Sequence, residues 1–324
     1  MFTWRKLGQL FDPTRMSTLP WMHHFAQTPA TLIFDDFVRI YFCTRPPADE
    51  AGQFVSRIGY VDVERDDLFR IRRISPNPVL PLGDLGTFDE FGTNPVSVIR
   101  NGAEVRAYYA GWTRCESVPF NSAIGVAQSF DDGETFERLG PGPILAYTPE
   151  EPFVIGSPKI RRFGDSWFLH YAAGQTWLNT GDRPEPVYVI RGAVSDDGIE
   201  WQRFGKDLVP KRLGELECQA GADIFWFDDR YHMFFSYRHA VGFQSTERAY
   251  RIGYAVSDDL VDWSRDDEAA GIQVSDKGWD SQTISYAHVF QLDESIYMLY
   301  QGNDIGRIGF GLAVLESYEA RSSA

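Results

Sequence analysis

The segment "WRKLGQLFDP", residues 4–13, begins the chain but has the pattern of a segment that elsewhere closes a structural unit. The same order of an aromatic residue, two polar residues, an apolar residue and a glycine recurs in "FERLGPGPIL" from Phe136 and in "WQRFGKDLVP" from Trp201. A segment that recurs along a chain indicates a repeat architecture, so the fold depends on finding the full repeat.

Five segments share one plan: a small or proline-containing start, an apolar strand, a polar turn and an aromatic-rich strand. They read "QTPATLIFDDFVRIYFCTR", "TNPVSVIRNGAEVRAYYAGW", "GSPKIRRFGDSWFLHYAAG", "AGADIFWFDDRYHMFFSYR" and "SYAHVFQLDESIYMLYQGN". Their equivalent positions are Ala30, Val96, Lys159, Asp223 and His288, which lie 66, 63, 64 and 65 residues apart by subtraction. So regular a period predicts five copies of one supersecondary unit.

A third strand follows in each unit, as in "AIGVAQS" and "RIGYAVS". Turn segments such as "SFDDGETF" in one unit and "SDDGIEW" in the next then lead to a fourth strand. Four antiparallel strands repeated around an axis make a β-propeller, so we predict an all-β, five-bladed propeller. We expect residues 1–324 to form a single domain. The fifth unit has no clear fourth strand, so residues 3–10 should pair with its third strand and leave no free edge at the seam.

The composition limits the partners. The net charge is −15, and nucleic acids and anionic membranes require a basic surface, so neither is an expected partner. Cys43, Cys115 and Cys218 are an odd number of well-separated thiols, which indicates a reducing, cytoplasmic location. No apolar segment follows Arg5 and Lys6, so no signal peptide is expected. We expect no cofactor, and nothing indicates the oligomeric state.

The first strand of each blade lines the channel of a propeller, and its side chains alternate. One set should therefore face the axis in two layers. The outer layer is Thr28, Asn94, Ser157, Gly221 and Tyr286. The inner, axial layer is Ala30, Val96, Lys159, Asp223 and His288. Of these, Lys159, Asp223 and His288 come from consecutive blades and could meet near the axis. Two interpretations stay open: a structural ion-pair plug, or a catalytic or anion-binding floor.

Carboxylates, aromatic residues and arginines gather at the predicted mouth of the channel. Aromatic faces stack on sugar rings and carboxylates bind hydroxyls, so the expected ligand is a carbohydrate. The candidate substrate-binding residues are His24, Arg45, Asp89, Glu90, Asn94, Trp112, Arg114, Lys159, Tyr237, Arg238, Tyr286 and Asp304. No metal site is expected, because the adjacent histidines His23 and His24 point opposite ways on an extended segment.

The blade plan, including "IGVAQSFDDGETF" and "IGYAVSDDLVDW", resembles the five-bladed propeller glycosidases: arabinanases, xylosidases, invertases and levansucrases, with mannoside phosphorylases as relatives. The resemblance covers essentially the whole chain. It implies acids at the starts of blades one, two and three. Here "QTPAT", "GTNPV" and "IGSPK" place Thr28, Asn94 and Ser157 there instead, and none of these can supply the proton transfers of glycoside cleavage.

Three interpretations remain. A hydrolase with a relocated site would use Glu217 as acid or base, with Asp223 and His288 behind it and Asp89 or Glu90 opposite. A transferase or phosphorylase would hold a phosphate or a sugar nucleotide with the candidate cations Arg45, Arg114, Lys159 and Arg238. A non-catalytic propeller would only bind glycans. A sialidase-like site is a minor alternative, because the sialidase propeller has six blades.

Overall fold

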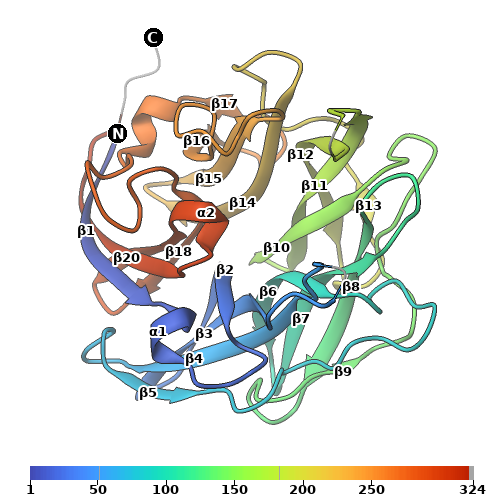
Figure 1. Ribbon diagram of the computed structural model, residues 1–324. Helices are drawn as coiled ribbons and strands as arrows, with labels where there is room; N and C mark the ends of the chain where they lie inside the picture. The colour runs from blue at the N-terminus through green and yellow to red at the C-terminus, as the bar shows by residue number, and fades with distance from the viewer. Residues whose placement is uncertain (51, 182, 321–324) are drawn as a thin grey trace.

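The computed structural model describes residues 1–50, 52–181 and 183–320. It contains five four-stranded antiparallel sheets around a central axis, with the first strand of each sheet innermost (Figure 1). The prediction of an all-β, five-bladed propeller is confirmed. Blade one consists of β2 (His24–Ile33), β3 (Phe37–Arg45), β4 (Arg57–Glu64) and β5 (Ile71–Ile74). Blade two consists of β6 (Thr93–Asn101), β7 (Glu104–Thr113), β8 (Asn121–Ser129) and β9 (Glu137–Arg138). Blade three consists of β10 (Ile155–Phe163), β11 (Ser166–Leu178), β12 (Glu185–Ser195) and β13 (Gln202–Arg203). Blade four consists of β14 (Glu217–Phe227), β15 (Arg230–His239), β16 (Arg251–Ser257) and β17 (Ser264–Arg265). Blade five consists of β18 (Ser285–Leu292), β19 (Ser295–Gln301), β20 (Phe310–Tyr318) and β1 (Phe2–Phe11).

The N-terminal strand closes the ring, as the opening segment of the sequence predicts. β1 pairs antiparallel with β20, with Trp4 opposite Leu315 and Lys6 opposite Ala313. The Trp4 indole Nε1 donates to the carbonyl of Ala270 at 3.1 Å. In Figure 1 the blue β1 lies beside the red strands of the last blade. The fifth sheet therefore joins the two ends of the chain, and the seam has a paired edge.

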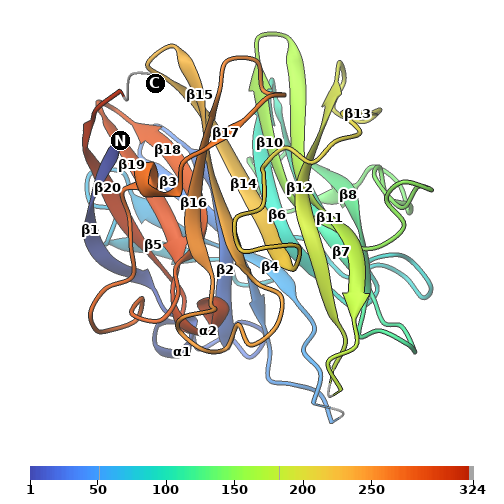
Figure 2. The same cartoon turned by 90° about the horizontal axis from the view of Figure 1, so that it is seen from above.

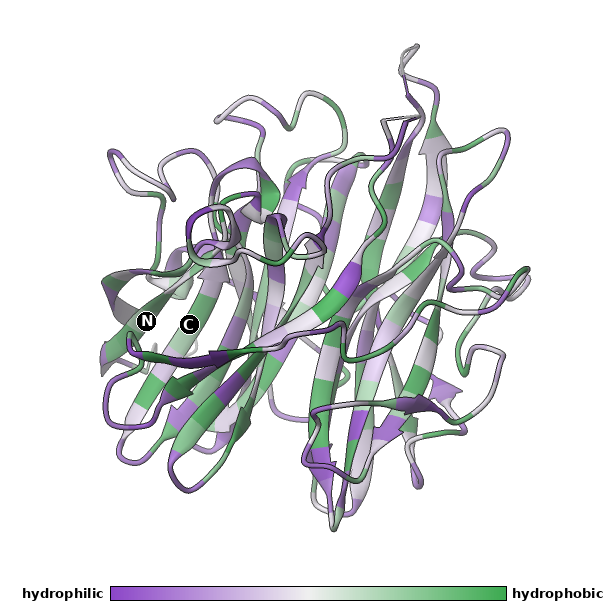
Figure 3. Ribbon diagram, turned by 60° about the horizontal axis from the view of Figure 1, so that its bottom comes forward, coloured by the Kyte–Doolittle hydropathy of each residue, from purple (hydrophilic) through white to green (hydrophobic). Residues whose placement is uncertain are grey.

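Apolar side chains fill the spaces between neighbouring blades. One core cluster joins Tyr108 and Val126 of blade two to Ile160 and Leu169 of blade three, and the other blades meet in the same way. Apolar and polar positions alternate along many strands, and the loops carry much of the hydrophilic colour (Figure 3). Burial of aromatic and aliphatic side chains between sheets is thus the main contribution to the stability of the ring.

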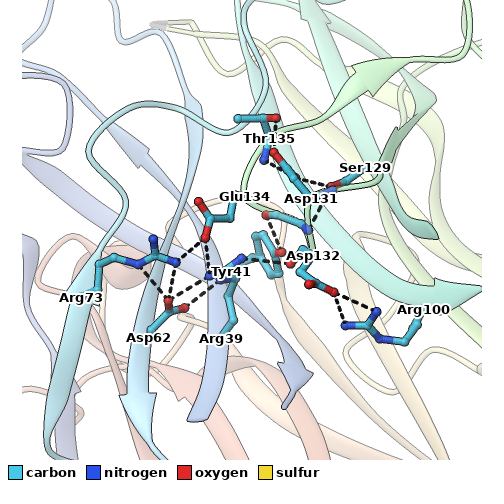
Figure 4. Close-up of polar contacts among 11 residues, drawn as sticks. Arg39, Tyr41, Asp62, Arg73, Arg100, Ser129, Asp131, Asp132, Glu134 and Thr135 are labelled. Carbon is cyan, nitrogen blue, oxygen red and sulfur yellow. Dashed lines mark hydrogen bonds and ion pairs between the residues drawn. The ribbon is translucent and has the colours of Figure 1, made fainter. Parts of the chain in front are cut away.

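The aspartate turns between third and fourth strands also join blades. In blade two, the Asp131 carboxylate accepts hydrogen bonds from Ser129 and Thr135, each at 2.6 Å (Figure 4). This turn presents the carbonyl of Gly133 to the hydroxyl of Tyr41 in blade one at 2.7 Å. The next blade boundary repeats the contact, because the Tyr108 hydroxyl donates to the carbonyl of Gly198 at 2.8 Å. These turns therefore fix the positions of neighbouring blades.

The starts of the innermost strands and the connections between second and third strands lie at one end of the ring, called the mouth end here. Antiparallel pairing within each sheet places them together. The short helices α1 (Pro13–Met16) and α2 (Asn303–Gly306) lie at this end, which is the lower end in Figure 2. The 3-10 helix η1 (Asp267–Ala270) follows β17. No helix in the described ranges is long and apolar enough to cross a membrane.

Candidate functional site

Buried polar atoms without a hydrogen-bond partner gather at the mouth end. Within the described ranges, seven of them belong to residues at the starts of innermost strands or the ends of second strands. They are His24 Nδ1, Thr93 Oγ1, Asn94 Oδ1, Gln219 Oε1, Arg238 Nε, Ser285 Oγ and Gln301 Nε2. An eighth, Lys159 Nζ, belongs to the middle residue of β10. Buried polar groups in folded proteins nearly always have partners. This concentration therefore marks the mouth end as the place where a polar ligand or ordered water would complete the hydrogen bonding.

Left-handed backbone conformations recur at the start of the innermost strands. Thr28, Ser157 and Tyr286 have φ values of 53°, 50° and 53°, and Gly221 has 62°. Each accompanies a shift of strand register. A β-branched or aromatic residue rarely adopts a positive φ, and such conformations concentrate at functional sites. Gly221 is needed because a Cβ there would lie 2.7 Å from Cδ1 of Tyr286.

The bulges lead to an axial layer in which Asp223 and His288 meet as predicted. Asp223 Oδ2 lies 3.4 Å from His288 Nδ1. Arg161 Nη2 binds both carboxylate oxygens of Asp223, at 2.8 and 2.9 Å. Lys159 lies close enough to interact electrostatically with Asp223, and its Nζ has no hydrogen-bond partner among the described residues. Lys159, Asp223 and His288 are all buried, with exposed fractions of 4% or less.

The charges in this layer are set by burial and by the neighbouring cations. Burial lowers the pKa of Lys159 to about 8 and the pKa of His288 to about 4, although Asp223 opposes both shifts. Burial acts to raise the pKa of Asp223, but Arg161 and His288 hold it well below its usual range. His170, opposite Lys159 in the sheet, is fully buried, and burial lowers its pKa to about 3. At neutral pH the layer thus combines an ionised aspartate with neutral histidines and a lysine that is easily deprotonated.

The axial side chains also connect successive blades. Asp223 Oδ2 accepts from the backbone amide of Val289 at 2.6 Å, and Ser97 Oγ accepts from the amide of Ile160 at 3.2 Å. His288 Nε2 lies 3.1 Å from the amide nitrogen of Thr31 in blade one. The ion-pair plug and the functional floor are therefore compatible, because the same residues connect blades and surround the unpartnered Lys159.

The position of Val96 in the axial layer was predicted incorrectly. Lys159, Asp223 and His288 each lie four residues before the residue that closes the first hairpin, at Phe163, Phe227 and Leu292. The corresponding residue in blade two is Ser97, because that hairpin closes at Asn101. Val96 instead packs in the core between blades one and two. One additional residue after Pro95 shifts the alternation.

A second polar group at the mouth end comes from blades three, four and five, and we call it the tyrosine–arginine cluster. Its members are Glu185, Tyr188, Arg238, Tyr250 and Tyr286. The hydroxyls of Tyr188 and Tyr250 are 2.5 Å apart, and Arg238 Nη2 donates to the Tyr188 hydroxyl at 3.1 Å. The rings of Tyr250 and Tyr286 are in edge contact at 5.7 Å.

Glu185 gives this cluster a carboxyl group with altered acidity. Its Oε2 lies 4.0 Å from Arg238 Nη2. Burial raises the pKa of Glu185, although the charges of Arg238 and Arg183 oppose the shift. A carboxyl group that keeps its proton closer to neutral pH suits a general acid. The predicted residues Arg238 and Tyr286 thus lie in one cluster with a carboxyl group.

Glu217 and Asp89 lie in a different environment from the axial layer. Glu217 is fully buried, and its carboxylate accepts from Arg265 Nη1 at 2.5 Å, Gln219 Nε2 at 2.8 Å and the amide of Leu213 at 2.6 Å. Asp89, also fully buried, accepts from the Tyr109 hydroxyl at 2.9 Å and from Arg138 Nε at 2.7 Å. In each ion pair a fourth-strand arginine binds an acid at or just before the start of the first strand of the same blade.

The other predicted rim residues divide between a cavity and the surface. Arg45, Trp112 and Arg114 line a cavity of about 480 Å³ together with Phe54, Phe91, Phe120 and Arg183. Trp112 Nε1 donates to the carbonyl of Asn94 at 2.5 Å. His24 lies beside this cavity, with its ring 6.3 Å from that of Phe54. We call this cavity the arginine pocket.

The remaining predicted residues are not shown to contact the axial layer. Glu90 Oε2 accepts a hydrogen bond from the amide of Gly86 at 2.9 Å. The ring centre of Tyr237 lies 4.7 Å from the guanidinium carbon of Arg265. Asp304 is exposed in α2. The sequence analysis missed Arg161, His170, Glu185, Tyr188 and Tyr250 as members of the candidate site. Only Arg161 and His170 carried a signal, since they are charged or titratable residues on otherwise apolar repeat strands.

Comparisons with known proteins agree with the fold. No protein-family model matches the chain. The uncharacterized protein Rv1502 of Mycobacterium tuberculosis is 35% identical over 317 residues, covering 97% of this chain and 99% of that protein. A solved glycoside hydrolase matches with a TM-score of 0.74 and 18% identity, covering 100% of this chain and 94% of that one. The β-1,2-mannobiose phosphorylase of Listeria innocua matches with a TM-score of 0.67 and 14% identity, covering 97% and 96%. The resemblance to the five-bladed glycosidase group with its phosphorylase relatives is confirmed at the level of the fold.

Proposed function

The chain belongs to the family of this mycobacterial protein, and we propose that it is a carbohydrate-active β-propeller that binds a sugar at the mouth end and cleaves a glycosidic bond. The fold it shares with glycoside hydrolases and a phosphorylase supports this class of substrate. Fold alone does not fix function, so the argument depends on the site itself.

The observation that carries the proposal is the set of buried, unpartnered polar atoms at the mouth end. It includes donors such as Arg238 Nε and Gln301 Nε2 and acceptors such as Asn94 Oδ1 and Gln219 Oε1, and Lys159 Nζ adds a further donor in the axial layer. A sugar presents several hydroxyls close together, and each of them both donates and accepts hydrogen bonds. A sugar would therefore satisfy donors and acceptors together, which an apolar ligand could not do.

We assign the proton donor for cleavage to Glu185. Glycoside cleavage requires a carboxylic acid that protonates the departing oxygen, while the anomeric carbon is transferred to water or, in a phosphorylase, to phosphate. Burial raises the pKa of Glu185, and its Oε2 lies 4.0 Å from Arg238 Nη2 within the tyrosine–arginine cluster. We place Glu217 outside the reacting groups, since its carboxylate is bound by Arg265 and Gln219 of its own blade and by the amides of Arg212 and Leu213 in the preceding loop. Asp223 and His288 are positioning residues that surround Lys159.

The test compares the full chain with its Glu185→Gln variant on paired nitrophenyl and methyl glycosides of several sugars. The wild type should release product from at least one sugar. Glu185→Gln should slow cleavage of the methyl glycoside by about 100-fold or more, because alkoxide departure needs a proton. Cleavage of the nitrophenyl glycoside should be less affected, since nitrophenolate leaves without protonation. The control is Glu200→Gln, which changes an exposed carboxylate.

Each reaction is run with and without phosphate. Cleavage only with phosphate would show a phosphorylase and contradict hydrolysis. A sugar that raises the melting temperature but is never cleaved would show a binding protein and contradict the enzymatic part of the proposal. The thiols of Cys43, Cys115 and Cys218 form no disulfide with one another, which supports a cytoplasmic location as part of the same proposal.

A further inference from the structure

We infer that the arginine pocket binds a carboxylate, so that the preferred sugar carries an acidic group such as that of a uronic acid. The inference rests on the proposed function, because it places the carboxylate on the sugar bound at the mouth end. It adds the chemical class of the substrate, which the fold does not provide.

The charge of the pocket is the first argument. The described residues that line it include three arginines, Arg45, Arg114 and Arg183, and one carboxylate, Glu116. Arg114 is already paired with Asp49 at 2.9 Å. The net charge of the whole chain is −15. A locally positive cavity in so acidic a protein selects anions over neutral molecules.

Arg45 is the residue that most needs an anion. Its Nε donates to Ser56 Oγ and its Nη2 to Gln27 Oε1, both at 3.0 Å, so its bonds to the described residues are to neutral groups. The guanidinium lies 4.3 Å from the ring centre of Phe25, and burial lowers its pKa to about 10, with Arg183 acting in the same direction. Arg45 is half-buried. A cation that is partly removed from water without a carboxylate partner is costly, and an anionic ligand would reduce that cost.

The walls of the pocket fit a sugar ring. Trp112 and Phe120 pack with ring centres 4.1 Å apart, and Phe54 and Phe91 complete an aromatic lining. The volume of about 480 Å³ is within the range of small-molecule sites. The Nδ1 atom of His24, beside Phe54, is buried and has no hydrogen-bond partner among the described residues. The pocket thus combines flat apolar faces, a buried imidazole nitrogen and positive charge.

A carboxylate fits this pocket better than a phosphate. With Arg114 neutralised by Asp49, the positive charge left by Arg45 and Arg183 is partly offset by Glu116 among the described lining residues. A singly charged carboxylate balances that remainder, whereas a doubly charged phosphate monoester would exceed it. Guanidinium groups bind the planar carboxylate through parallel hydrogen bonds.

The experiment is calorimetric titration of the full chain with matched methyl glycosides. Methyl glucuronoside, galacturonoside and mannuronoside are each compared with the neutral parent, and glucose 1-phosphate represents phosphate. For at least one pair, the acid should bind about 10-fold or more tightly than its parent. That preference should decrease in 0.5 M sodium chloride, while neutral binding should change little.

The variants are Arg45→Gln, Arg45→Lys and, as control, Arg100→Gln. Arg100 is a surface arginine paired with Asp132 at 3.1 Å and lines a cavity at the other end of the innermost strands. Arg45→Gln should remove the preference for the acid and keep neutral binding. Arg45→Lys, which retains the charge, should keep part of the preference if Arg45→Gln fails to fold.

Equal affinities for acid and parent, or a preference that survives Arg45→Gln, would overturn this inference and leave the proposed function intact. Tighter binding of glucose 1-phosphate than of every uronoside would overturn the assignment to a carboxylate. No binding by any charged or neutral sugar would overturn both the inference and the proposed function.

Discussion

Lys6 Nζ lies 2.6 Å from Asp280 Oδ2, which joins the first strand of the chain to the start of its last blade. The same relationship occurs within blades two and four, as Arg138 with Asp89 and Arg265 with Glu217. A fourth-strand cation thus binds an acid at or just before the start of the first strand of its own blade. In the fifth blade this cation comes from the other end of the chain, so ring closure includes an ion pair as well as strand pairing.

Lys6→Met should lower the free energy of unfolding by about 3 kcal/mol, because it leaves the buried Asp280 carboxylate without its cation. The neighbouring Arg5→Met is the control. Arg5 pairs with Glu316 on the surface, with side chains 59% and 47% exposed, so its loss should cost less than about 1 kcal/mol. Urea denaturation measures both. Equal losses for the two variants would contradict a role of Lys6 in ring closure.

Glu217→Gln should destabilise the protein by about 3–5 kcal/mol, because the fully buried Arg265 loses its partner. Asp267, 2.9 Å from Arg265, would compensate only in part. Chemical denaturation gives the free energy, and sugar binding by the folded variant should be retained. A variant with wild-type stability but no activity would instead support a catalytic Glu217.

Lys159→Met should stabilise the protein while weakening sugar binding. The lysine is fully buried and lacks a hydrogen-bond partner in the described parts of the chain, so an apolar side chain of similar length removes a desolvation cost of about 1–4 kcal/mol. Asp223 keeps Arg161 as a partner. Denaturation and titration with the best sugar measure the two effects. Lower stability with unchanged binding would show that Lys159 has only a structural role.

The free energy of unfolding should fall as the pH decreases from 6.5 to 4. Burial lowers the pKa of His288 and His232 to about 4 and that of His170 to about 3 in the folded state. In this window the unfolded chain therefore binds more protons than the folded one, and acid favours unfolding. Each histidine contributes about 1.4 kcal/mol per pH unit. The free energy of unfolding, measured by denaturation at each pH in this range, should depend less steeply on pH in His170→Gln than in the wild type. An unchanged pH dependence would contradict the lowered pKa of His170.

Much of the ring could be predicted because each repeat carries its own strands and turns. The closure by residues 3–10 followed from one missing strand, and the meeting of Asp223 and His288 followed from equal spacing along innermost strands. The bulges at the strand starts were not predictable, since residues such as Thr28 and Tyr286 rarely adopt a positive φ. The wrong placement of Val96 in the axial layer also arose at a strand start, where the register shifts between Thr93 and Val96.

The candidate site was less predictable than the fold because its residues come from segments that do not repeat. Glu185 and Tyr188 lie at the start of β12, which is longer than the third strand of any other blade, and Tyr250 precedes β16. Rim carboxylates such as Asp89 and Glu217 looked available in the sequence, but each is bound by a cation from the fourth strand. Only tertiary packing shows which charges are already paired.

The most direct test of the central claim is a crystal structure of the protein with the sugar that binds most tightly in solution. Our account predicts the sugar at the mouth end, with a ligand oxygen about 3 Å from Lys159 Nζ or Arg238 Nε. A sugar bound at the opposite end of the ring, with these atoms still unpartnered or bonded only to water, would contradict it.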